Sequence, residues 1–339
     1  MASSERKLGV GICGLGRAGS IHLDNVAKSF DLQLLYVVEF RTEHAQTLLT
    51  KYHQDQCEIV SPSDLDKMLS DERVDFVMVC TPTNLHEEQV LKSLNAGKGV
   101  FCEKPIAATE EATLNCYKAA ESNGKPLFCS FNRRYDPSLR KLYNERSELG
   151  QIQMVKMCAR DSPFPPIEYL KISGGVFHDC LVHDIDAACW ILGEFPKRVY
   201  AAAHAHNDAI KEMGDVDTVA AILKFESGAL AIIDTSRDSR YGYDQRCEVF
   251  GTNGMFLNQN QRPSNMIKEE LNGQSMGRMY NSFADRYELS YIQALQHFCR
   301  AVKGEESIEI SKESTINVSK IATALEESCK KGCEIEVPY

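Results

Sequence analysis

Apolar runs alternate with amphipathic stretches over residues 1–128. The runs at 8–13, 32–38 and 74–80 are almost wholly apolar, which is typical of strands buried on both faces of a sheet. Between such runs, residues 86–98 carry apolar side chains at helical spacing and end on a glycine and a lysine, a common helix stop signal. This alternation predicts a parallel, doubly wound sheet, in which ligands bind at the carboxyl ends of the strands.

The pattern changes after residue 128. Apolar and polar residues then alternate with a period of two, with glycine or asparagine between the runs, and few helices interrupt them. We therefore expect a substrate-binding and oligomerisation α/β domain over 129–339, with a large, open, mostly antiparallel sheet, after a dinucleotide-binding domain over 1–128. Two stretches near the C-terminus, 283–303 and 312–331, predict helices that pack back on the first domain. Strands of the second domain are expected near 151–161, 196–206, 216–225, 228–237 and 245–254.

A Gly-x-Gly-x-x-Gly motif follows the first predicted strand at once and opens a helical pattern. Gly14 permits the tight turn, Gly16 lets the backbone approach a pyrophosphate, and Gly19 allows the helix to pack closely on the strand. The phosphates would then lie at the helix N-terminus, beside Arg17 and Ala18, where free N–H groups and the helix dipole favour anions. Strand, glycines and helix together predict a dinucleotide site.

The second predicted strand ends at Glu39. A carboxylate there accepts hydrogen bonds from the adenosine ribose hydroxyls and repels a 2′-phosphate, so Glu39 favours NAD over NADP. Arg41 leaves the alternative open, because a guanidinium that turned inward would pair with a 2′-phosphate.

Polar residues gather where the next two predicted strands end. They are Thr81, Pro82, Asn84 and His86 after one strand, and Glu103, Lys104 and Pro105 after the other. Since carboxyl ends of parallel strands form the ligand edge of such a sheet, we expect these residues to line the cofactor site. Lys104 also offers a cation that would reach a substrate oxygen.

Residues 173–186, SGGVFHDCLVHDID, combine two glycines with an acid and base pattern. If the glycines open a helix, Asp179, His183 and Asp186 fall at i, i+4 and i+7 and share one face. Trp190 lies seven residues past His183, so we expect this polar face to be covered rather than solvated. A separate apolar stripe is formed by Leu181, Val182, Ile185, Ala188, Cys189 and Leu192.

The composition of the chain excludes some classes of binding partner and indicates its cellular compartment. The 339 residues suffice for two domains, and the net charge of -10 argues against nucleic acid or an anionic membrane as a partner. No apolar run is long enough to cross a bilayer, and 13 cysteines without a C-x-x-C pair suit reduced thiols, so we expect a cytoplasmic protein. His204 and His206 share one face of a strand, but without a third ligand nearby we expect no metal.

Seven segments along the chain point together to one known family. They are GICGLGRAG, CTPTNLHEE, CEKP, FNRRYDPS, SGGVFHDCLVHDID, GDVDT and YGYDQRCEVFG. In this order and spacing they resemble the Gfo/Idh/MocA oxidoreductases over essentially the whole chain. The resemblance implies a Rossmann domain, a C-terminal α/β domain with an open sheet, and commonly a homotetramer built through that sheet. It implies catalytic roles for Lys104, Asp179 and His183, and places Arg133 and Tyr243 near the substrate.

Two segments, RDSPFPPIEYLKISGGVFHDCLVHDID and YGYDQRCEVFG, look specific to the branch of this family that oxidises myo-inositol. That likeness implies NAD-dependent oxidation of a secondary hydroxyl of a cyclic polyol, here myo-inositol to 2-keto-myo-inositol (scyllo-inosose), with His183 as general base. A dehydrogenase for scyllo-inositol, glucose or another sugar is an alternative within the enzymes. A non-catalytic NAD-binding sensor on the same fold is the alternative from another class.

Overall fold

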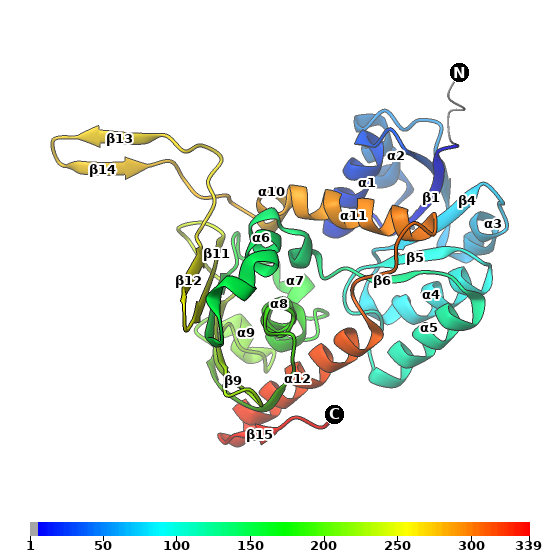
Figure 1. Ribbon diagram of the computed structural model, residues 1–339. Helices are drawn as coiled ribbons and strands as arrows, with labels where there is room; N and C mark the ends of the chain where they lie inside the picture. Colours follow the sequence, from blue (N-terminus) through cyan, green and yellow to red (C-terminus); the bar gives the residue numbers. More distant parts are fainter. Residues whose placement is uncertain (1–5) are drawn as a thin grey trace. The chain divides into compact units, whose positions relative to one another are not determined.

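A computed structural model describes residues 6–339, which fall into two compact units (Figure 1). The first unit combines Met1–Asn132 with Tyr291–Ile316, and the second combines Arg133–Ser290 with Asn317–Tyr339. The chain therefore leaves the first unit and returns to it. The expected boundary between residues 128 and 129 stays a prediction.

A six-stranded sheet organises the first unit, in the order β3-β2-β1-β4-β5-β6. Every neighbouring pair is parallel, which is the doubly wound arrangement predicted from the apolar runs. All six residues of β1 are buried, so a run without polar alternation is what this position requires. The elements are β1 (Leu8–Cys13), α1 (Arg17–Lys28), β2 (Leu32–Val38), α2 (Thr42–Lys51), β3 (Glu58–Val60), α3 (Leu65–Leu69), β4 (Val74–Val79), α4 (His86–Asn95), β5 (Gly99–Cys102), α5 (Glu110–Asn123) and β6 (Leu127–Cys129).

A late segment of the chain completes the core of this unit. Phe298 lies on α11 (Glu288–Val302), and its ring meets Phe76 of β4 at 5.1 Å and Phe101 of β5 at 5.6 Å between centroids. Phe101 in turn stacks on Phe128 of β6 at 4.7 Å. Because all four rings are fully buried, residues as far apart in sequence as Phe76 and Phe298 share one hydrophobic cluster.

A seven-stranded sheet organises the second unit, in the order β12-β11-β7-β10-β9-β8-β15. Only β7 and β10 are parallel to each other, so the sheet is mixed and mostly antiparallel, as predicted. The remaining elements are α6 (Pro137–Glu145), β7 (Ile152–Arg160), α7 (Ile167–Leu170), α8 (Val182–Leu192), β8 (Pro196–His204), α9 (Asp208–Glu212), β9 (Thr218–Phe225), β10 (Leu230–Ser236), β11 (Asp244–Gly251), β12 (Gly254–Asn258), β13 (Ile267–Glu270), β14 (Gly273–Met276), α10 (Phe283–Arg286), α12 (Lys312–Lys331) and β15 (Ile335–Glu336).

One face of this sheet is buried and the other is open. In β9 buried residues alternate with exposed ones, which is the period-two pattern of the sequence. On the open face Tyr200 lies opposite Ile222 in the register of β8 and β9, and both are partly exposed. β13 and β14 form a hairpin that extends away from the sheet (Figure 1). The helix expected over 283–303 is divided at Tyr287 into α10 and α11.

Candidate functional site

The glycine turn after β1 has the geometry of a phosphate-binding loop. Gly14 adopts a φ of 85°, and a Cβ on Gly19 would clash with the carbonyl oxygen of Gly14, so the turn and the close helix packing both require glycine. Gly16 caps α1, and a Cβ added to it would meet nothing within 4 Å. The first turn of α1, with Arg17 and Ala18, carries neither a side-chain cap nor an acidic residue. These features fit a pyrophosphate.

Glu39 lies directly after β2, as the dinucleotide motif requires. It is 4% exposed, and its Oε2 accepts the backbone N–H of Leu15 at 2.9 Å. Burial raises the pKa of Glu39, but hydrogen bonds from Arg41 and Leu15 outweigh it and hold the pKa below the usual value. Arg41 donates from Nε to Oε1 at 3.2 Å, so its guanidinium is engaged with the acid rather than turned alone toward a phosphate.

His86 joins the two loops that follow β4 and β5. Its Nδ1 lies 2.7 Å from the carbonyl oxygen of Pro105, and its Nε2 lies 2.7 Å from that of Thr81. Burial lowers the pKa of His86, although both carbonyls favour the charged form. Pro82 and Asn84 lie in the short turn between Thr81 and α4. His86 therefore brings the predicted residues of the two strand ends together.

Glu103 and Lys104 follow β5 directly. Glu103 Oε1 lies 2.7 Å from Nε2 of His22, which is fully buried on α1. Burial raises the pKa of Glu103, but His22 and then Lys104 outweigh it, so the pKa is below its usual value and the carboxylate is ionised. Sequence reasoning missed His22, whose only signal was a polar residue on the buried side of α1. This pair ties the loop of Lys104 to the helix of the glycine motif.

In the second unit, a π-helical turn over Phe177–Leu181 precedes α8. Gly174 and Gly175, with φ of 85° and 84°, let the chain turn into it. Asp179 lies in the π turn and His183 in the first turn of α8. The expectation of one regular α-helix over this stretch was therefore wrong, because π-helical hydrogen bonds span five residues and α-helical ones span four. His183 still follows Asp179 by about one turn.

Tyr169 and Arg237 each hold one carboxylate oxygen of Asp179. Tyr169 Oη donates to Oδ1 at 2.7 Å from α7, and Arg237 Nη1 donates to Oδ2 at 2.9 Å from the end of β10. Arg237 is fully buried and also reaches Asp215 at 3.5 Å. Neither Tyr169 nor Arg237 was predicted. Arg237 lies 58 positions from Asp179, and Tyr169 lies on the separate short helix α7.

The face of α8 beyond His183 is covered, as expected from Trp190. The Trp190 ring stacks on Tyr143 of α6 with centroids 3.9 Å apart and planes at 8°. Asp186 is 1% exposed and accepts two hydrogen bonds from Arg134, at 2.9 and 2.5 Å. Asp186 therefore has a buried ion-pair partner within its own unit, which the helical spacing alone did not indicate.

Arg133, predicted to lie near the substrate, is buried and donates from Nη1 to Oδ1 of Asp184 at 2.6 Å. Burial raises the pKa of Asp184, and Arg133 works in the opposite direction. The pair joins the chain after β6 to α8 beside His183. The sequence contained no signal that Asp184 would face Arg133.

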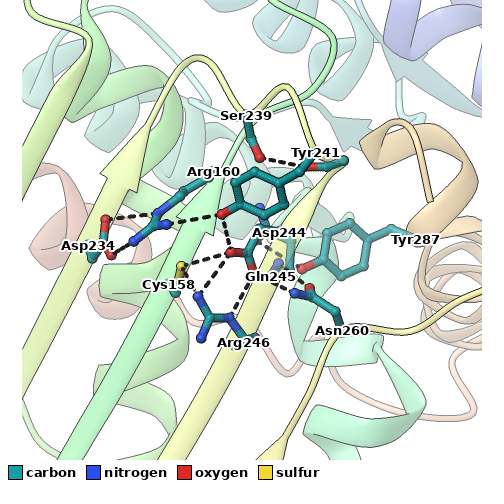
Figure 2. Close-up of polar contacts among 11 residues, drawn as sticks. Cys158, Arg160, Asp234, Ser239, Tyr241, Asp244, Gln245, Arg246, Asn260 and Tyr287 are labelled. Carbon is teal, nitrogen blue, oxygen red and sulfur yellow. Dashed lines mark hydrogen bonds and ion pairs between the residues drawn. The ribbon is translucent and has the colours of Figure 1, made fainter. Parts of the chain in front are cut away.

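Tyr243, the other predicted substrate residue, lies in a loop that a polar network fixes. Figure 2 shows the network around Asp244, which accepts hydrogen bonds from Tyr241 at 2.6 Å, Arg246 at 2.8 Å and Asn260 at 2.5 Å. Tyr243 is buried, and its backbone N–H donates to Tyr280. The network therefore fixes the backbone of the loop that carries Tyr243.

This network makes stability depend on pH. Burial raises the pKa of Asp244, but Arg246, Tyr241 and Asn260 outweigh it and lower the pKa to about 2. A depressed pKa contributes stability above the unfolded value and loses it as pH falls toward 2. We expect Asp244→Asn to lower the free energy of unfolding by about 2 kcal/mol at pH 7, with the difference narrowing below pH ~4.

Urea denaturation of the two proteins at a series of pH values measures this difference. Asp238→Asn is the matched control, because Asp238 is partly exposed and pairs only loosely with Arg240 at 3.5 Å. It should change the free energy of unfolding by less than about 0.5 kcal/mol. A loss at pH 7 that persists unchanged at low pH would mean that the ionised form of Asp244 is not what stabilises the loop.

His204 and His206 have rings 4.7 Å apart. Across residues 6–339 no group of three or more His, Cys, Asp or Glu side chains is placed to hold a metal ion. Over the same range no helix has both the length and the apolar character needed to span a membrane.

Two family profiles match the chain. Residues 8–131 match the oxidoreductase family with an NAD-binding Rossmann fold, and residues 139–257 match the GFO/IDH/MocA C-terminal domain. Myo-inositol 2-dehydrogenase of Thermotoga maritima is 35% identical over 96% of each chain.

Solved structures agree with these profiles. A putative myo-inositol dehydrogenase from Sinorhizobium meliloti 1021 superimposes with a TM-score of 0.92 at 32% identity, over 98% of this chain and 100% of that one. Scyllo-inositol dehydrogenase from Lactobacillus casei, with bound NAD(H) and scyllo-inositol, gives 0.90 at 26% identity over 98% and 99%. The chain therefore belongs to the Gfo/Idh/MocA oxidoreductase family, as an NAD-dependent dehydrogenase that acts on a CH–OH group.

Proposed function

We propose that this enzyme oxidises myo-inositol to 2-keto-myo-inositol. The observation that carries the proposal is the Asp179 carboxylate, fixed by two donors one turn before His183. An acid and a base in this order supply what removal of a hydroxyl proton needs. The 35% identical relative named for myo-inositol supports this choice of substrate.

Three side chains have proposed roles in the chemistry. His183, neutral near pH 7, removes the proton from the reacting hydroxyl. Asp179 orients the imidazole and stabilises the imidazolium that results. Lys104 holds the reacting oxygen while negative charge develops on it. Bound NAD supplies the acceptor for the hydride at C4 of its nicotinamide.

We propose that the two units divide the binding work. Gly14, Gly16 and the first turn of α1 hold the pyrophosphate, and Glu39 accepts the ribose hydroxyls. Arg133 and Tyr243 contact the polyol in the second unit. Arg133 keeps donor groups beyond the one given to Asp184, because a guanidinium carries five N–H bonds.

Initial rates on a panel of cyclic polyols test the proposal. We expect myo-inositol with NAD to give the highest kcat/KM, with scyllo-inositol, glucose and other hexoses lower. NADP should be at least tenfold poorer than NAD, because Glu39 would lie against its 2′-phosphate. If kcat/KM were higher for scyllo-inositol than for myo-inositol, scyllo-inositol would become the proposed substrate, in line with the structural neighbour that binds it. No NADH formation with any polyol would refute the enzymatic proposal.

We also propose a homotetramer assembled through the open face of the second unit's sheet. The cross-strand pair of Tyr200 and Ile222 gives this face apolar side chains that remain partly exposed, as do Phe250 and Met255 across β11 and β12. Such a patch is a common interface between copies of one chain. Light scattering should give four times the chain mass of 38.0 kDa.

A further inference from the structure

We propose that Arg237 and Tyr169 are positioning residues that clamp the carboxylate of Asp179 and thereby set the basicity of His183. The inference rests on the proposed function, since it assumes that His183 is the base. It extends that function to two residues that touch neither substrate nor cofactor in the proposed chemistry. Arg237 holds the Asp179 carboxylate with a positive charge, and Tyr169 holds it with a neutral hydroxyl.

Arg237 is placed with little freedom. It follows β10 directly, and its backbone N–H donates to the carbonyl of Asp217 at 2.9 Å. Its side chain is fully buried, with Nη1 on Asp179 at 2.9 Å and Nη2 on Asp215 at 3.5 Å. Nη2 also lies 3.4 Å from the hydroxyl of Ser173, just before the glycines. A buried guanidinium with this many acceptors is a fixed cation.

The carboxylates around Arg237 outnumber its single positive charge. Three carboxylates belong to the cluster, Asp161, Asp179 and Asp215, and the guanidinium faces the thiol of Cys180 at 3.5 Å. Burial first and then the charge of Asp179 raise the pKa of Asp161, while Arg133, Cys180 and Arg237 lower it. The titratable or charged groups that face this cluster include Arg133, Asp161, Tyr169, Cys180, His183, Asp215 and Arg237.

Tyr169 completes the clamp from the other side. Its hydroxyl donates to Oδ1 of Asp179 at 2.7 Å, whereas Arg237 takes Oδ2. Tyr169 lies on α7, in the proline-rich segment 161–171. The position of the 161–171 segment is thus linked to the acid that orients the base.

The clamp predicts a shift in basicity with a definite sign. Removing the charge of Arg237 makes the surroundings of His183 more negative, so the protonated imidazole is stabilised and its pKa rises. The base acts only when it is neutral. With a raised pKa, the fall in activity on the acid side of the pH profile would therefore begin at a higher pH. A change that keeps the charge leaves the pKa in place.

The experiment compares kcat/KM against pH for the whole enzyme with myo-inositol and NAD. The acid limb of this profile is the range in which kcat/KM falls as the pH is lowered. We expect Arg237→Gln to move the midpoint of the acid limb to higher pH by about half a unit or more. Arg237→Lys should leave that midpoint within about 0.2 pH units of the wild-type value. Tyr169→Phe removes a neutral donor, so kcat should fall about fivefold or more with little movement of the limb. Arg286→Gln is the control: it removes an equally buried arginine, bonded to Asp136 at 2.6 Å, and should not move the limb.

The outcomes separate this inference from the proposed function. If the wild-type enzyme oxidises myo-inositol but Arg237→Gln leaves the limb in place, or Arg237→Lys shifts it equally, the clamp is refuted while the function stands. If no polyol is oxidised, the function fails, and the pKa of His183 is then followed by NMR of ¹³C-labelled histidine in both proteins. An unchanged His183 pKa in Arg237→Gln refutes the clamp there too.

Folding of the variants is checked by thermal melting. If Arg237→Gln does not fold, the other two variants decide the matter. Arg237→Lys must keep the acid limb, and Tyr169→Phe must lose turnover. Unchanged kcat in Tyr169→Phe overturns the clamp.

Discussion

Replacing His183 with alanine is expected to lower kcat for myo-inositol about a hundredfold or more, while the affinity for NAD stays nearly unchanged. The variant removes the proposed base but leaves the glycine loop and Glu39, in the other unit, as they are. Steady-state kinetics measure the first quantity, and quenching of protein fluorescence on titration with NAD measures the second.

His178→Ala is the matched control for this change. His178 lies five residues earlier and contacts Glu326 of α12 at 3.6 Å. Burial lowers the pKa of His178, although Glu326 opposes this, so His178 is a weakly basic imidazole near the same turn. Its loss should leave kcat within severalfold of wild type. Normal turnover in His183→Ala, or an equal loss in both variants, would remove His183 from the role of base.

Replacing Lys104 with methionine is expected to lower kcat by about a hundredfold to a thousandfold. Methionine keeps most of the length of the side chain but removes the cation that we propose to hold the reacting oxygen. Because that charge matters most when negative charge develops on the oxygen, kcat should fall more than KM rises. The measurement is a full rate curve in myo-inositol at saturating NAD.

Lys98→Met is the control for Lys104. Lys98 lies just before β5 and donates from Nζ to the carbonyl of Asp71 at 2.8 Å, far along the strand from the ligand edge. Burial lowers the pKa of Lys98, with Asp71 opposing. Its variant should affect stability without changing kcat. A Lys104→Met enzyme with raised KM and normal kcat would make Lys104 a binding residue only.

Local pattern was sufficient for much of the fold. The buried run of β1 and the glycines at residues 14 and 19 specify a turn whose sterics the structure confirms, because each constraint lies within a few residues. The alternation in β9 likewise identified a sheet with one open face. Periodicity carries this information because it reflects which side of each element is buried.

Partners distant in sequence could not be predicted in this way. Arg237 reaches Asp179 over 58 positions and Arg134 reaches Asp186 over 52, so only the tertiary fold pairs them. The π turn was also hidden, since an α-helix and a π turn differ by one residue of hydrogen-bond spacing and share the same side-chain composition. The predicted helix was therefore regular, whereas the observed one begins with a π turn.

The cluster of Phe298 with Phe76 and Phe101 has a consequence for how the protein is made. Residues 291–316 are synthesised after most of the second unit, yet they belong to the first unit. Before residues 291–316 are made, Phe76 and Phe101 of the nucleotide-binding sheet therefore have no partner from α11. Completion of that core waits for α11, so we expect the six-stranded sheet to expose this aromatic surface to chaperones until α11 has been made.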